Sequence, residues 1–143
     1  MFEQIMHNNQ ILAIIVSNSY SDKGIKFFTP NDFSQQLAYM NRPKGYKIEP
    51  HVHNAVPRNI DWTQEVLFIK SGRVQVDFYD QKRVYLESRV LSAGDVILLA
   101  HGGHGFKMLE ETEMIEVKQG PYAGDQDKTR FKAVSDQEIN IKG

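Results

Sequence analysis

Apolar and polar residues alternate most strictly in the middle of the chain. Between Arg73 and Tyr79, Val74, Val76 and Phe78 share one face of an extended segment, and polar residues occupy the other face. A similar alternation runs from Arg83 to Leu91. Side chains of a β-strand point to opposite faces in turn, so this period of two predicts two half-buried strands.

Shorter apolar runs on both sides predict further strands. Val96–Leu99 is apolar throughout, which predicts a strand that is buried on both faces. The other predicted strands are Ile11–Val16, Ile25–Thr29, Tyr46–Val52, Thr63–Lys70, Phe106–Leu109 and Glu113–Lys118. Turn residues such as Ser71–Gly72 separate them. Many short strands joined by tight turns predict an all-β sandwich or barrel.

One segment departs from the strand pattern and predicts a helix. Pro30 and the capping residues after it are typical of a helix start. Phe33, Leu37 and Met40 follow at helical spacing. We therefore expect one short N-terminal helix over Asp32–Met40.

Composition narrows the class of protein. The length of 143 residues predicts one domain. The net charge of −1 gives no excess of basic side chains that would indicate binding to nucleic acid. The chain has no cysteine, so thiolate metal sites and cysteine nucleophiles are excluded. The apolar stretch Ile11–Val16 is too short to cross a bilayer. We expect a cytoplasmic protein that does not interact with membranes.

Histidines supply the candidate chemistry. On a strand, His51 and His53 would share one face, and two adjacent imidazoles form half of a metal site. Glu65 shares its face with Leu67 and would point inward; in the opposite register it would face water. His101 and His104 follow in a glycine-rich stretch, which is either a close-approach loop or an ordinary strand connection.

These residues resemble the two motifs of the cupin superfamily. The first is similar to Gly45, His51-Val52-His53, Glu65 and Gly72, with an insertion at Pro57–Trp62. The second is similar to Gly94 and Ala100-His101-Gly102-Gly103-His104, with alanine in place of the usual proline and the last histidine one residue early.

The resemblance implies a cupin double-stranded β-helix, a jelly-roll-like barrel, with its core at about residues 45–119. Residues 1–44 would then add strands and the short helix, and residues 120–143 a C-terminal surface segment. It also implies a homodimer, with the strands Ile11–Val16 and Ile25–Thr29 as candidate interface. His51, His53, Glu65 and His104 would bind a divalent transition metal, namely Fe, Mn, Ni, Zn or Cu.

Three other residues are candidates for contact with a small-molecule ligand. We interpret His101 as a proton-transfer residue beside the metal. In the inserted loop, Arg58 could bind a carboxylate or phosphate and Trp62 could stack on a ring. The alternative is a solvated loop that is anchored by one aromatic side chain.

Several functions fit these features. The first is a metal-dependent isomerase or epimerase that acts on a sugar or sugar nucleotide. The chain also loosely resembles small cupin ketoisomerases of sugar nucleotides, in which barrel histidines do acid–base work without a metal. An Fe(II)-dependent dioxygenase and a non-catalytic binding or sensing module are the alternatives.

Overall fold

The protein is built almost entirely from antiparallel β-strands. The computed structural model describes all 143 residues. One sheet has the order β1-β2-β8-β5-β10, a second has the order β7-β6-β9, and β3 and β4 form a separate hairpin. The strands are β1 Phe2–His7, β2 Gln10–Val16, β3 Gly24–Phe27, β4 Ala38–Asn41, β5 Glu65–Ser71, β6 Arg73–Tyr79, β7 Tyr85–Ser92, β8 Val96–Leu99, β9 Gly103–Met108 and β10 Glu113–Lys118.

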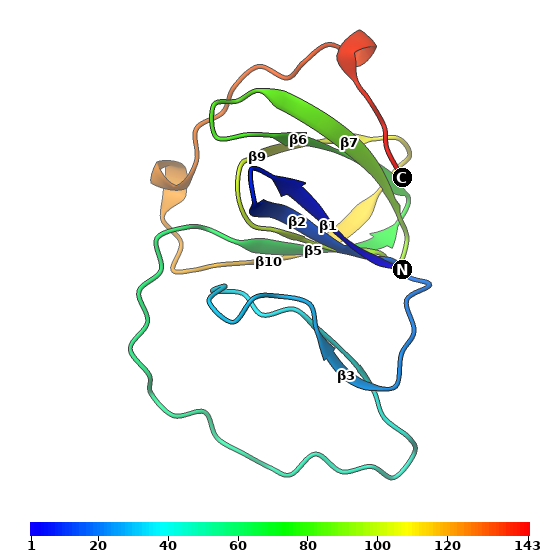
Figure 1. Ribbon diagram of the computed structural model, residues 1–143, viewed down its shortest axis with the longest axis vertical. Coiled ribbons are helices and arrows are strands. Elements are labelled where there is room, and N and C mark those ends of the chain that lie inside the picture. Colours follow the sequence, from blue (N-terminus) through cyan, green and yellow to red (C-terminus); the bar gives the residue numbers. More distant parts are fainter.

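The two larger sheets face each other and enclose the main core (Figure 1). Leu67 and Ile69 of β5 point into this core, as do Val76 and Phe78 of β6, and all four are buried. The predicted all-β architecture is confirmed, and the bounds predicted for β6, β8 and β10 match the observed ones. β9 and β10 remain sheet edges, so the two sheets form an open sandwich and not a closed barrel.

The predicted helix over Asp32–Met40 is wrong. Residues 31–37 form turns and bends, and β4 follows and pairs with β3. Phe33 and Leu37 pack against a second core, which covers the outer face of β2 and β8. The side chain of Gln36 donates to the backbone oxygens of Pro30 and Phe33, at 2.8 and 2.9 Å. Tertiary packing and these side-chain bonds replace the helical bonds that the apolar spacing suggested.

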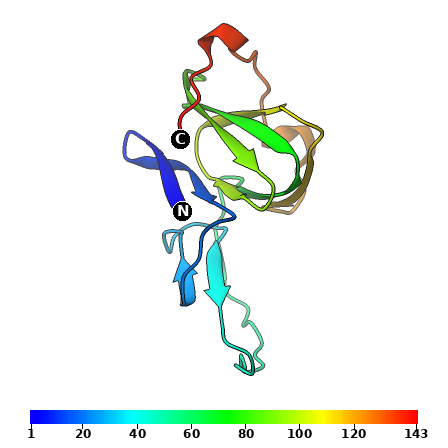
Figure 2. The same cartoon turned by 90° about the vertical axis from the view of Figure 1, so that its right-hand side faces the viewer.

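The predicted strand Tyr46–Val52 is also absent. Residues 43–62, which we call the arm, contain no helix or strand and run away from the sandwich (Figures 1 and 2). No backbone–backbone hydrogen bond involves residues 47–63. A single extended segment gains little unless it pairs with a sheet edge, and the arm pairs with none of the edges in this chain.

The C-terminal segment packs against the sandwich. Its two short 3-10 helices, η1 Gly124–Asp127 and η2 Asp136–Glu138, flank a stretch that crosses β6 and β9. The last residues pair with β7: Ser88 N donates to Asn140 O and Lys142 N to Ser88 O, both at 2.9 Å. None of the helical segments is long and apolar enough to cross a membrane.

Candidate functional site

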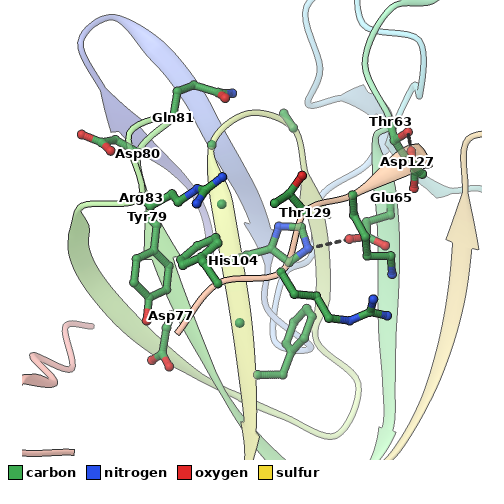
Figure 3. Close-up of a pocket in the computed structure, with 18 of the residues that line it drawn as sticks. Thr63, Glu65, Asp77, Tyr79, Asp80, Gln81, Arg83, His104, Asp127 and Thr129 are labelled. Carbon is green, nitrogen blue, oxygen red and sulfur yellow. Dashed lines mark hydrogen bonds and ion pairs between the residues drawn. The ribbon is translucent and has the colours of Figure 1, made fainter. Parts of the chain in front are cut away.

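An ion pair at one end of the sandwich marks the candidate site. Glu65 begins β5 on the same face as the buried residues Leu67 and Ile69, so its side chain points inward. Of the two registers that the sequence allowed for Glu65, the structure has the inward one. His104 lies opposite Phe78 in the β6–β9 ladder and points to the same side. His104 Nε2 and Glu65 Oε1 are 2.6 Å apart (Figure 3).

The pair defines which nitrogen of His104 is available. The hydrogen bond from His104 lowers the pKa of Glu65 to about 2, against the opposing effect of burial. Glu65 is therefore an ionised acceptor at neutral pH, and Nε2 of His104 carries the hydrogen of the bond. Nδ1 has no hydrogen-bond partner within the chain and is left to accept a proton. The same carboxylate raises the pKa of Glu116 through a shared hydrogen bond.

We expect the Glu65–His104 pair to stabilise the fold less as the pH falls. A depressed carboxyl pKa contributes stability above the ordinary value of 4.5 and loses it as the pH falls toward about 2. Glu65→Gln should lower the unfolding free energy by about 1–2 kcal/mol at pH 7, after allowance for screening by water, and by less near pH 3. Urea titrations of both proteins across this range would measure the difference.

Glu113→Gln is the matched control. Glu113 is 62% exposed and is 3.6 Å from Lys70, so its removal should change stability by less than about 1 kcal/mol at either pH. A Glu65→Gln difference that grows on acidification would contradict the assigned proton positions.

The pair lines a cavity of about 680 Å³. The cavity lies between strands β5, β6, β9 and β10 and the C-terminal stretch Asp127–Phe131, and its opening faces solvent. Figure 3 shows His104 and Thr129 in the middle, with Arg83 and Tyr79 on one side and Glu65 on the other. Residues far apart in the sequence therefore converge on a single space.

Every carboxylate in the lining already has a partner within the chain. Glu65 is bound by His104, and the Thr63 hydroxyl donates to Asp127. Asp80 Oδ1 accepts from the backbone N–H groups of the β6–β7 turn at 2.8 and 2.9 Å. Asp77 accepts from Ser88 Oγ at 2.5 Å and from Gln75 Nε2 at 2.8 Å. Solvated acidic groups therefore do not dominate the cavity.

The lining also contains four cationic side chains. They are Arg83, Lys118, Lys128 and Arg130. None of them forms an ion pair with a carboxylate of the chain. Unpaired ammonium and guanidinium groups around one cavity attract an anionic ligand, and guanidinium groups bind carboxylate or phosphate by paired hydrogen bonds. The lining holds as many carboxylates as cationic side chains, so an anion would be bound by these individual groups and not by an overall positive field.

Two glycines before His104 allow the site to form. Gly102 has a φ of +73°, and a Cβ there would lie 2.4 Å from the Tyr79 carbonyl oxygen. A Cβ on Gly103 would lie 3.0 Å from the Phe131 ring. The glycine-rich stretch is therefore a close-approach loop, as the first interpretation proposed, but what approaches is the chain's own β6 end and C-terminal segment.

The other predicted ligands lie outside the cavity. His51 and His53 are on the arm, exposed to solvent, with ring centroids 5.3 Å apart. No group of three or more histidine, aspartate or glutamate side chains in the chain is placed to hold a metal ion. Glu65 and His104 alone are two donors, fewer than a protein metal site normally supplies. One chain in this arrangement does not fit the expected metal.

The three predicted ligand-contact residues have separate positions. Trp62 lines the cavity at its rim. His101 does not line it and instead lies edge-on to Phe33 and Trp62, with ring centroids 6.0 and 6.4 Å apart. Arg58 borders a different hollow beside residues 31–36. Of these three, only Trp62 shares a space with His104.

Several lining residues escaped the sequence reasoning. Tyr79 and Lys118 end strands that were predicted correctly, but their convergence depends on the pairing of the sheets. Arg83 has a φ of +68°, which is unusual for a residue with a side chain and is common at functional sites. In the sequence, only the position of Arg83 directly after the turn Asp80–Lys82 could have indicated this unusual conformation.

Comparison with known proteins adds no family to this geometry. No protein-family model, no curated protein and no solved structure matches the chain. Function must therefore be argued from the cavity itself.

Proposed function

We propose that this chain is a cupin-type protein that binds a small oxygenated anion, such as a sugar nucleotide, and isomerises or epimerises it by proton transfer. The observation that carries the proposal is the His104–Glu65 pair, 2.6 Å long, in a cavity whose cationic side chains form no ion pair. A cavity of about 680 Å³ has the size of small-molecule sites in proteins.

His104 would act as the acid–base group. Its Nδ1 would take the proton from a carbon beside a carbonyl, and the electron pair of the broken C–H bond would pass into an enediolate. Glu65 would hold the ring and stabilise the imidazolium. The imidazolium would then return the proton to the neighbouring carbon on the same face, which isomerises the ligand; epimerisation at the first carbon would need a second acid on the opposite face.

The cationic side chains would hold the charged part of the ligand. Lys118 and Arg130 line the same cavity as His104, so a diphosphate bound by them would leave the sugar near the imidazole. Trp62 at the rim offers an aromatic surface for a base or sugar ring. This division of labour explains why the cations are unpaired while the carboxylates are engaged.

The cupin fold is part of the proposal. Two antiparallel sheets face each other, and Glu65 of the first motif meets His104 of the second across the end of the sandwich. A likeness of fold alone leaves the reaction open, so the chemistry is argued from the cavity.

A two-stage experiment tests the proposed function. A thermal-shift screen of nucleotide sugars, sugar phosphates and their uncharged sugars should give a rise in Tm for the charged members only. Binders that carry a carbonyl would then be incubated with the protein in D₂O, and NMR should show deuterium at the carbon next to the carbonyl. Binding without exchange would remove the enzymatic part of the proposal, and no binding in either class would remove the whole.

A further inference from the structure

The cavity has a second part, on the outer face of β6 and β9. Residues of β6 alternate between the core and this outer face, and Asp77 and Tyr79 point outward. Asp77 lies opposite Gly105 in the β6–β9 ladder. Figure 3 shows Asp77 and Tyr79 on the side of His104 that lies away from Glu65. We call this outer part the recess, and its lining consists of Asp77, Tyr79, Gly105, Phe131 and Ala133.

The C-terminal segment covers the recess and is attached at three points. The ring of Phe131 lies edge-on to the ring of Tyr79, with centroids 5.0 Å apart. The backbone N–H of Val134 donates to the Tyr79 hydroxyl at 3.2 Å. Further along, Lys107 Nζ and Asp136 Oδ2 are 3.1 Å apart. The recess is therefore a space with a fixed ceiling.

Gly105 leaves the floor of the recess open. A Cβ built on Gly105 would meet nothing within 4 Å, whereas a Cβ on Gly103 would lie 3.0 Å from the Phe131 ring. Residues that face each other across a ladder have Cβ positions about 5 Å apart. The empty position at Gly105 is therefore directly beside the side chain of Asp77, and it has room for at least one methyl-sized group.

Asp77 presents one unpartnered oxygen to this space, although the residue is only 7% exposed. Both of its side-chain hydrogen bonds end at Oδ1, from Ser88 Oγ at 2.5 Å and from Gln75 Nε2 at 2.8 Å. The side-chain atoms that are fully buried without a partner are Glu87 Oε2 and Arg89 Nε. Asp77 Oδ2 is not among them, so it touches open space, and the open space beside it is the recess.

The hydrogen-bond network behind Asp77 consists of donors that point toward it. Ser88 has one hydroxyl hydrogen, which it donates to Asp77, so the Tyr85 hydroxyl 2.7 Å away must donate to Ser88. The backbone N–H of Asn140 in turn donates to the Tyr85 hydroxyl at 2.8 Å. This chain of bonds fixes the orientation of the carboxylate and leaves Oδ2 as an acceptor.

We propose that the recess binds the primary ammonium group of a small amine, with Asp77 Oδ2 as its acceptor. A carboxylate forms its strongest hydrogen bonds with charged donors. A guanidinium group binds best to two oxygens at once, whereas an ammonium group is a compact donor that suits a single oxygen. The rings of Tyr79 and Phe131 would pack against the carbon chain of the amine.

No cation of the chain occupies this position. Arg83 places its guanidinium 5.7 Å from the centre of the Phe131 ring, and Lys107 pairs with Asp136. Asp77 forms no ion pair with any basic side chain. A carboxylate that is removed from water without a charged partner is costly, so an ammonium ligand would stabilise Asp77 in its observed place.

An NMR titration with butylammonium chloride tests the recess. The amide signals of Gly105 and Ala133 should shift, with a Kd of about 1–10 mM for a ligand of this size with one charged contact. Butanol has the same carbon chain without the charge and should bind roughly tenfold more weakly. Butylammonium has no carbonyl and no anionic group, so the result does not depend on the proposed isomerase activity of His104.

Asp77→Asn removes the charge and keeps the shape of the side chain. Its oxygen can still accept from Ser88 and Gln75, while its NH₂ group takes the place of Oδ2 and cannot accept a hydrogen bond. The Kd for butylammonium should rise by roughly tenfold or more. Asp61→Asn is the matched control, because Asp61 is exposed on the arm and does not line the cavity. It should change the Kd by less than about twofold.

Gly105→Val tests the site without altering Asp77, so the proposal does not rest on the folding of Asp77→Asn alone. Valine suits a strand, and its side chain would fill the recess, so the Kd should again rise by roughly tenfold. Wild-type affinity in either folded variant would overturn the proposal. Equal affinities for butanol and butylammonium, or no shift at Gly105, would overturn it as well.

Discussion

Replacement of His104 by glutamine is expected to slow carbon–deuterium exchange of a bound carbonyl ligand by about 10²- to 10⁴-fold. Glutamine can keep a hydrogen bond to Glu65, but it has no nitrogen that titrates near neutral pH. The 2.6 Å bond to Glu65 makes His104 the one imidazole in the cavity whose ring is fixed by a carboxylate. NMR rates in D₂O at saturating ligand would measure the loss.

His7→Gln is the matched control for this substitution. His7 lies 3.8 Å from Asp80 and does not line the cavity. Its replacement should leave the exchange rate within about twofold. If His104→Gln kept the ligand-induced rise in Tm and also kept the wild-type exchange rate, His104 would not be the acid–base group.

Gly102→Ala is expected to destabilise the fold by about 2–4 kcal/mol, a large part of the stability of a domain of this size. At a φ of +73°, alanine is strained, and its Cβ would lie 2.4 Å from the Tyr79 carbonyl oxygen. Because the strain and the contact with Tyr79 both lie in the backbone, neither can relax through a side-chain rotation. Urea unfolding would measure the change, and Tm should fall by roughly 10 °C.

Gly105→Ala separates this effect from a general intolerance of alanine in β9. Gly105 does not have a positive φ, and an added Cβ would meet nothing within 4 Å. Its unfolding free energy should change by less than about 1 kcal/mol. Equal losses in both variants would mean that the close approach of Tyr79 does not limit position 102.

Much of the fold was predictable because strand alternation is a local property. Arg73–Tyr79 alternates in period two, and Val96–Leu99 is continuously apolar, so both strands were found with their observed bounds. Asp32–Met40 failed because helical spacing of Phe33 and Leu37 also suits residues that pack on a neighbouring sheet. Short segments take the structure that tertiary packing favours.

The sequence predicted half of the candidate site. Glu65 and His104 were selected from the sequence, and the structure brings their side chains together. His51 and His53 were selected with them, but the arm places both in solvent. A local pattern can show that two histidines share a face, whereas it contains no information on which sheet edge that face will meet.

By itself, the sequence determined the all-β class and the positions of the histidines along the chain, and it restricted Glu65 to two registers. These follow from periodicity and residue chemistry, which act over a few neighbouring residues. Only the tertiary structure decided which of these residues meet: His104 with Glu65, and Arg83 with Arg130 around one cavity. Such meetings depend on strand order and on contacts between distant segments, and those are set by packing of the whole chain.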